Sequence, residues 1–196
     1  MYSIYLWAAL APLIGAIVAG LFGRVIGRSG AHWVTIIGVA IATILSFLAY
    51  KHVVMDGAPA FNGTVYVWGI VGDLRLEVGF LIDELSATMM LVVTFVSLMI
   101  HIYTIGYMAD DPGYQRFFSY ISLFTFAMLM LVTSDNFLQM FFGWEGVGLM
   151  SYLLIGFWYH KPEANAAAIK AFVVNRVGDF GFALGIFAIF YAAIDF

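Results

Sequence analysis

Apolar residues run along most of this chain in long blocks, and short polar or glycine-rich interruptions separate one block from the next. A helix rises about 1.5 Å per residue, so a block of about 20 apolar residues can cross the roughly 30 Å hydrocarbon core of a membrane. The pattern therefore predicts an all-α integral membrane protein with about six transmembrane helices. They lie near residues 3–23, 33–54, 81–108, 115–133, 136–158 and 164–194.

The interruptions agree with these boundaries. Arg24 and Arg28 close the first segment, and the Asp-Asp-Pro-Gly run at 110–113 breaks the chain after the third. The Ser-Asp-Asn run at 134–136 can cap the fifth segment, and Pro162 stands at the start of the sixth.

The positively charged loops predict the orientation. Arg24 and Arg28 give their loop the clearest excess of basic residues, and such loops face the cytoplasm or the mitochondrial matrix. Arg116 and Lys161 then fall on the same inner side, and the N-terminus lies on the outer side. We expect a multi-pass protein of the bacterial inner membrane, or of the mitochondrial inner membrane if the source is eukaryotic.

The second connection, on the outer side, predicts a small β-hairpin near residues 64–80. Apolar positions alternate with Arg75, Glu77 and Gly79 on one side of a Gly/Asp turn at 69–73, and a β-branched and aromatic run precedes that turn. An isolated hairpin is marginally stable in water, so we expect this one to dock on a neighbouring element or subunit. The alternative is a mobile surface loop.

Composition narrows the chemistry. The chain is 64% hydrophobic and 10% charged, with a net charge of −4 and a mean hydropathy of +0.99. No basic run suggests nucleic acid. The chain has no cysteine, and its four histidines are far apart without ligand spacing, so we expect no metal site and no redox centre in this chain.

Three charges lie deep inside predicted helices. Glu145 stands about midway along the fifth segment, and Arg176 and Asp179 lie about 18 to 22 Å from the start of the sixth. A charge at the membrane centre costs roughly 2.5–3.5 kcal/mol on the insertion scale, so all three must face protein or water. Arg176 and Asp179 are three residues apart, so they lie on one face of the helix, where an ion pair is expected. Lys170, about 9 Å into the same helix, can either snorkel to the interface or join them.

Interior acids with basic neighbours on adjacent helices are typical of proton relays in pumps and transporters. We predict Glu145, Lys170, Arg176 and Asp179 as proton-transfer residues, with His101 as a further relay candidate. The alternatives are a static ion-pair cluster and, for His101, a satisfied histidine near a helix end. Glycines beside the charges permit close packing or water entry; they are Gly143, Gly146, Gly148, Gly178, Gly181 and Gly185.

Two runs of sequence carry a resemblance. One runs from Phe142 to Tyr159 and contains Gly-Trp-Glu-Gly-Val-Gly around Glu145, and the other runs from Ala171 to Phe182. Both closely resemble the distal antiporter-like membrane subunit of proton-pumping NADH:quinone oxidoreductase, respiratory complex I, which is chain L in bacteria and chain 5 in mitochondria. Residues 101–108 and 116–142 are similar to it too, whereas the first two helices fit only in pattern.

The resemblance implies a fold of inverted repeats, each with a helix broken in mid-membrane beside a lysine. In the family, the glutamate matching Glu145 pairs with the lysine of the first broken helix. No such helix follows here before Phe196, so we expect residues 1–196 to form a single membrane domain, the N-terminal portion of a longer subunit: its first helices and the start of the first inverted repeat.

The resemblance also implies a function. The chain would be a proton-translocating subunit of an NADH:quinone oxidoreductase, with FMN, Fe–S clusters and quinone bound by other subunits and no cofactor bound by this chain. Its partners would be the lipid bilayer and other membrane-arm subunits, especially the adjacent antiporter-like subunit. Two alternatives stay open: a subunit of a multisubunit cation/proton antiporter, and a structural membrane spacer.

Overall fold

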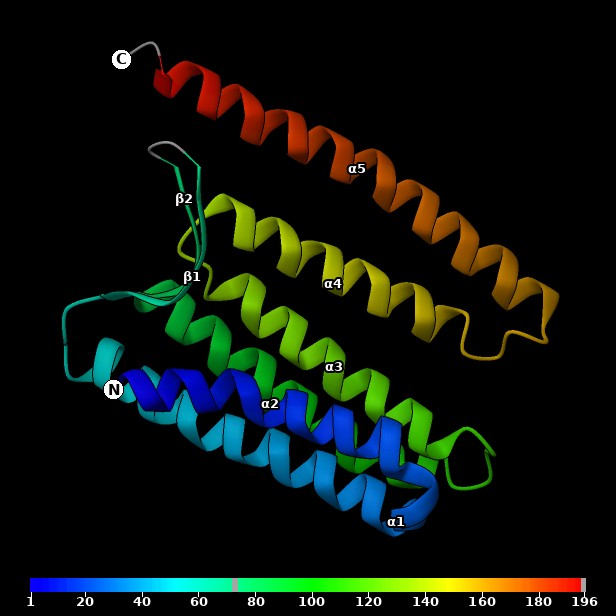
Figure 1. The fold of residues 1–196 in the computed structure, drawn as a ribbon. Helices are drawn as coiled ribbons and strands as arrows, with labels where there is room; N and C mark the ends of the chain where they lie inside the picture. Colours follow the sequence, from blue (N-terminus) through cyan, green and yellow to red (C-terminus); the bar gives the residue numbers. More distant parts are fainter. Residues whose placement is uncertain (72–73, 195–196) are drawn as a thin grey trace.

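The computed structural model describes residues 1–71 and 74–194. Five of the helical segments in this part of the chain are long and apolar enough to cross a membrane, and the first, Tyr2–Met55, contains both limbs of a helical hairpin. The predicted fold class, a helical membrane protein with one small sheet, is confirmed. Along the chain the elements are α1 (Tyr2–Tyr50), η1 (Lys51–Met55), β1 (Phe61–Val71), β2 (Leu74–Ile82), α2 (Glu84–Tyr107), α3 (Tyr114–Val132), α4 (Phe137–Ile155) and α5 (Pro162–Ile194) (Figure 1).

Helix α1 turns back on itself at Gly27, where φ is 70° and ψ is −174°. This φ lies in the region that favours glycine, because a Cβ would clash there. The predicted segments 3–23 and 33–54 lie on the two limbs, which run side by side (Figure 1). Small residues bring the limbs together: a Cβ added to Gly38 would lie 2.7 Å from the carbonyl oxygen of Ala11.

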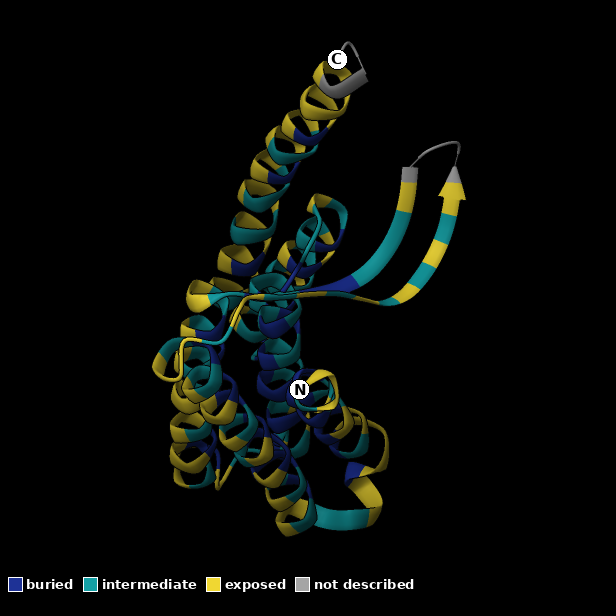
Figure 2. Cartoon of the chain, turned by 90° about the vertical axis from the view of Figure 1, so that its left-hand side faces the viewer, coloured by how far each residue is buried: buried dark blue, intermediate teal, exposed yellow. Residues whose placement is uncertain are grey.

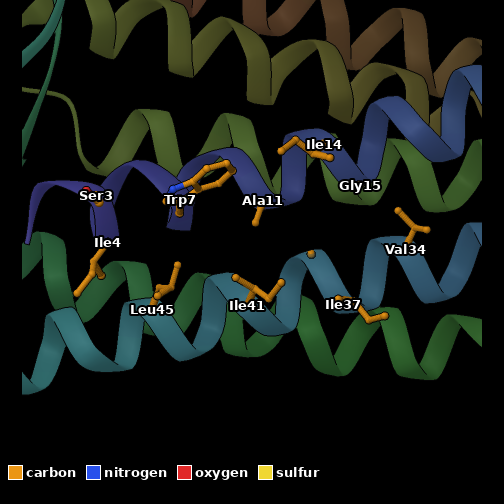
Figure 3. A pocket seen from close by; sticks show the side chains of 11 residues that line it. Ser3, Ile4, Trp7, Ala11, Ile14, Gly15, Val34, Ile37, Ile41 and Leu45 are labelled. Atoms are coloured by element: carbon orange, nitrogen blue, oxygen red, sulfur yellow. The ribbon is translucent and has the colours of Figure 1, made fainter.

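The limbs of α1 leave an apolar groove of about 600 Å³ between them, with Trp7 and Ile14 on one limb and Ile37 and Ile41 on the other (Figure 3). All four side chains are exposed. An apolar, open groove on a spanning hairpin is a surface that lipid chains fit, because those chains are as apolar as the side chains.

Helix α3 lies in the middle of the bundle, with α1 and α2 on one side and α4 on the other (Figure 1). Helix α5 lies at the edge and packs on α4. The α1 turn, the α2–α3 connection and the α4–α5 connection meet at one end of the bundle, here called the turn end. The N-terminus, the β-hairpin and the α3–α4 connection meet at the other, the hairpin end.

Two boundaries differ from the prediction. Helix α2 begins at Glu84 rather than 81, because Leu81 and Ile82 complete β2 and Asp83 caps the helix by accepting the Ser86 N–H at 2.7 Å. Helix α4 ends at Ile155 rather than 158. Its predicted polar start is confirmed, since the Asn136 side chain accepts the Gln139 N–H at 2.8 Å.

The β-hairpin is confirmed, but its strands are longer than predicted. Strands β1 and β2 pair antiparallel from Phe61 opposite Ile82 to Val71 opposite Leu74, so residues 69–71 belong to β1 and not to the turn. Gly72 and Asp73 of the predicted turn lie outside the described residues. Register shifts occur between Thr64 and Tyr66 and between Val67 and Gly69. Bulges of this kind increase the twist and bend of a strand.

The base of the hairpin docks on the helices, as expected. The Gln139 side chain donates to the Gly79 carbonyl at 3.0 Å and accepts the Gly79 N–H at 2.8 Å, and the Leu81 N–H donates to the Thr133 carbonyl at 2.9 Å. Phe80 and Ile82 are buried in a core with Tyr5, Met90 and Leu129. The distal part projects away from the helices and is exposed at Tyr66, Trp68 and Ile70 (Figure 2).

Candidate functional site

Glu145 lies near the middle of α4, about 12 Å from its first residue. The approach of α3 and α4 fixes its position, because a Cβ added to Gly143 would lie 2.7 Å from the Leu131 Cα. This confirms close packing at one of the glycines beside the charges. The Glu145 side chain is 23% exposed, so the carboxylate is largely covered without being enclosed.

Arg176 joins the two acids. Its position is about 21 Å along α5, its Nη2 donates to Oε2 of Glu145, and its Nε lies 3.0 Å from Oδ2 of Asp179. The expected ion pair between Arg176 and Asp179 at i and i+3 is present. The guanidinium also lies over the Phe172 ring, 4.8 Å from its centroid. One cation therefore bridges α4 and α5 at membrane depth.

Trp144 completes this cluster. Its indole Nε1 donates to Oδ1 of Asp179 at 2.8 Å, and the Asp179 side chain is 7% exposed. In the sequence alone, Trp144 stands out only as part of the Gly-Trp-Glu-Gly-Val-Gly motif. The signal available in the sequence was an indole N–H in an apolar helix, one residue from a deep carboxylate, because a Trp N–H in apolar surroundings needs an acceptor.

The cluster of Glu145, Arg176, Asp179 and Trp144 holds two carboxylates and one guanidinium, so it carries one excess negative charge when all three groups are ionised. The Arg176 side chain is 40% exposed and faces outward from the described residues. The arrangement therefore brings together two acids that share one cation.

Lys170 is not brought into this cluster. It is exposed on α5, six residues before Arg176, and makes no ion pair with any residue that the structure describes. This placement is compatible with the snorkelling geometry considered from the sequence.

His101 lies in a separate polar chain between α2 and α3. It is fully buried, its Nδ1 is 2.8 Å from the Ser97 carbonyl oxygen, and Ser97 Oγ contacts Thr125 Oγ1. Its Nε2 is buried without a hydrogen-bond partner among the described residues. The structure does not bring His101 into contact with the α4–α5 cluster.

The glycines of α5 behave differently from Gly143. A Cβ added to Gly178, Gly181 or Gly185 would meet no atom of the described chain within 4 Å. Large apolar side chains on the same helix, such as Val177 and Phe180, are also exposed. This face of α5 is therefore open to lipid or to another polypeptide segment.

Two family models match the chain. The model described as NADH-ubiquinone oxidoreductase (complex I), chain 5 N-terminus, matches residues 68–118. The model described as NADH:quinone oxidoreductase/Mrp antiporter, TM, matches residues 134–194, which include the whole cluster.

Curated relatives match almost all of the chain. NADH-quinone oxidoreductase subunit L of Neisseria meningitidis is 60% identical over 94% of this chain and 27% of the relative. NADH-ubiquinone oxidoreductase chain 5 of Triticum aestivum is 50% identical over 98% of this chain and 29% of the relative. Subunit L of Rhodobacter capsulatus is 52% identical over 93% of this chain and 26% of the relative. The chain thus spans between a quarter and a third of the length of these relatives.

A solved structure has the same fold. It is a chain of the membrane-bound sulfane sulfur reductase, an archaeal respiratory membrane complex, with a TM-score of 0.77 over 93% of this chain and 36% of that one. Sequence identity is 19%, so this likeness concerns the arrangement of the helices alone.

Proposed function

Because the chain belongs to the subunit L and chain 5 family of NADH:quinone oxidoreductase, we propose that it carries protons across the membrane as part of that complex. The observation that supports this is the bridge that Arg176 forms at membrane depth between Glu145 and Asp179. An ion-pair cluster with a purely structural role needs only as many acids as cations. The cluster around Arg176 has one carboxylate more than it has cations, and we propose that this extra carboxylate takes up a proton.

The proposed step is a movement of the Arg176 side chain. When the guanidinium moves away from Glu145 and stays with Asp179, the Glu145 carboxylate loses its partner and binds a proton, because a partly desolvated acid without a cation favours its neutral form. When the guanidinium returns, the proton leaves. Trp144 holds Asp179 in place during the exchange, and the exposed side of Arg176 gives the cation room to move.

Lys170 and His101 belong to the proposed relay as outlying members. Neither contacts the cluster within the described residues, so a proton would reach them through water or through another part of the protein. Lys170 lies between Arg176 and the turn end along α5, which suits a role in exchange with the inner side.

The proposal includes the surroundings of the chain. Residues 1–196 form one membrane domain, the first helices and the start of the first inverted repeat of the subunit, with the N-terminus on the outer side of a bacterial or mitochondrial inner membrane. The adjacent antiporter-like subunit is its main partner. FMN, Fe–S clusters and quinone are held by other subunits, which supply the redox energy that the proton step uses.

A multisubunit cation/proton antiporter is the second candidate, because the description of the model that matches residues 134–194 names it as well. The curated relatives cited above favour the oxidoreductase, since all three are subunit L or chain 5. In an antiporter, the same cluster would exchange protons without NADH oxidation.

The decisive experiment replaces Glu145 in the full-length subunit. Glu145→Gln keeps the size and hydrogen bonding of the side chain but cannot ionise, so it should impair NADH-driven acidification of inverted vesicles as severely as Glu145→Ala. Glu145→Asp should retain part of the activity. Assembly of the complex and NADH oxidation are measured in the same membranes.

The outcomes separate the candidates. A correctly assembled Glu145→Gln complex that pumps at the wild-type rate would remove Glu145 from the proton path and favour the structural spacer, because glutamine preserves packing and spares a buried charge. An antiporter would leave NADH oxidation untouched when the subunit is deleted.

A further inference from the structure

A cavity of about 710 Å³ opens at the turn end of the bundle, and the hairpin lies at the opposite end. The α1 limb before Gly27, the beginning of α3 and the α4–α5 connection form its walls. Unlike the apolar groove of α1, it is lined by charged side chains, among them Arg24, Arg116 and Lys161.

The charge of this cavity is positive. Three cations and His160 line it against a single acid, Asp111. The Asp111 carboxylate is already occupied, because Oδ2 accepts the Trp158 indole N–H at 2.8 Å and Oδ1 accepts the Gly113 N–H at 2.6 Å. Burial raises the pKa of the Asp111 carboxyl, but these two hydrogen bonds and the charges of Arg116 and His160 together lower it below its ordinary value.

The three cations differ in how far other residues of the chain already engage them. Arg116 donates to the Phe157 carbonyl at 3.1 Å, and Lys161 lies 4.8 Å from the centroid of the Trp158 ring. Arg24 is exposed and makes no hydrogen bond or ion pair with the residues that the structure describes. Arg24 and Lys161 are therefore available to a ligand, whereas Arg116 also supports the loop.

The N-terminus of α3 opens into the same cavity. Gly113 and Gln115 line it, and the first turn of α3 has no side-chain cap among the described residues. The N–H groups of a first turn and the helix dipole attract anions. The Gly113 N–H is bound by Asp111, so the donors available here are those of the first turn of α3 itself. The site thus combines these donors with the exposed cations Arg24 and Lys161 in a space large enough for a phosphate and its glycerol.

The position of the cavity in the fold and the side chains around it indicate which class of anion it suits. The cavity lies at the ends of spanning helices, beside Tyr159 and Trp158, which are residue types that gather at the membrane interface. Leu21 and Phe22, next to Arg24, are exposed and offer an apolar surface to acyl chains. Basic pockets between helices at this depth suit anionic lipid headgroups.

We infer that this cavity binds the phosphate headgroup of an anionic glycerophospholipid. The phosphate oxygens meet Arg24, Lys161 and the first turn of α3, and the acyl chains follow the outer surface of α1. This inference goes beyond the proposed function and does not depend on it.

The test uses the assembled complex with the full-length subunit in phosphatidylcholine nanodiscs that contain a trace of phosphatidylglycerol with a photoactivatable headgroup. Cross-linked peptides are mapped by mass spectrometry. Wild-type protein should be labelled within residues 108–120 or 156–161. Arg24→Gln combined with Lys161→Gln should lower this labelling about tenfold or more, because each cation near the membrane surface adds to the binding of an anionic lipid.

Three controls decide the assignment. Arg75→Gln removes an exposed cation at the hairpin end and should leave the labelling unchanged. Arg24→Gln alone, at an exposed position, keeps the test valid if the double variant fails to assemble, and should lower the labelling about fivefold. Wild-type labelling in either Gln variant, or equal labelling by a photoactivatable phosphatidylcholine, would overturn the inference. Loss of labelling on addition of inorganic phosphate at constant ionic strength would overturn the choice of a lipid over free phosphate.

Discussion

Trp144 on α4 donates its indole N–H to the buried carboxylate of Asp179 on α5, with 2.8 Å between Nε1 and Oδ1. The same carboxylate faces Arg176 through its other oxygen. Asp179 is thus held by a hydrogen bond from α4 and by an ion pair within α5. Helix α5 packs on the bundle mainly through α4, so this contact stabilises a helix that is otherwise widely exposed.

Removing the indole N–H should disturb this arrangement. Trp144→Phe keeps an aromatic ring beside Phe182 but leaves Oδ1 of Asp179 without its donor. A hydrogen bond to a charged group contributes about 1.5–3 kcal/mol, so we expect pumping to fall by about tenfold while assembly persists. NADH-driven acidification per assembled complex is the measurement. Phe141→Leu, at a neighbouring ring that makes no polar contact, is the matched control and should pump normally. Equal rates in both variants would contradict a positioning role for Trp144.

Arg176 and Asp179 should show energetic coupling. Arg176→Ala leaves the Glu145 and Asp179 carboxylates without their cation, whereas Asp179→Ala removes one of the two acids that Arg176 faces and leaves it with Glu145. Stranding a charge costs several kcal/mol in a buried pair and less here, because Arg176 is 40% exposed. Each single variant should lower the amount of assembled complex or its pumping. The double variant should recover part of the loss. The measurement is a double-mutant cycle on assembled complex and acidification, and strict additivity would show that the two residues do not interact.

Much of this fold follows from the sequence because membrane spans are long and uniform. The start of α2 follows less clearly from the sequence, because the apolar residues Leu81 and Ile82 fit either the end of β2 or the first turn of a helix. The pairing of Arg176 with Asp179 follows from a spacing of three on one helix. The contacts of Arg176 with Glu145 and of Trp144 with Asp179 do not, because they depend on the rotation of α5 against α4, which no local pattern encodes.

The orientation in the membrane can be tested with cysteines, because this chain has none. Asn62→Cys, on the exposed face of β1, should react with a membrane-impermeant maleimide added from the periplasmic or intermembrane side. Asp110→Cys, at the turn end, is the opposite control and should react only after the inner side is opened. The reverse labelling pattern would invert the assigned topology.

Asp83 predicts a pH dependence of stability. The hydrogen bond from the Ser86 N–H lowers the pKa of the Asp83 carboxyl below its ordinary value, against a smaller opposing effect of burial. A lowered folded-state pKa stabilises the protein above the unfolded value of about 3.9, and this contribution is lost as the pH falls through the folded value. Asp83→Asn accepts the same hydrogen bond without titrating. The thermal midpoint of the wild-type full-length subunit should exceed that of this variant near pH 6 and approach it below about pH 4. A gap that is constant with pH would contradict this assignment.

The paired hydrogen bonds between Gln139 and Gly79 tie the β-hairpin to the helix that carries Glu145. Gln139 and Glu145 are about 9 Å apart along α4, on a rigid stretch of helix. The base of the hairpin is thus attached to α4, and a rotation of this helix that carried the hairpin with it would displace the exposed strand residue Tyr66. A spin label or fluorophore near Tyr66 would report movement of α4 during turnover from outside the membrane, without a probe inside the proton path.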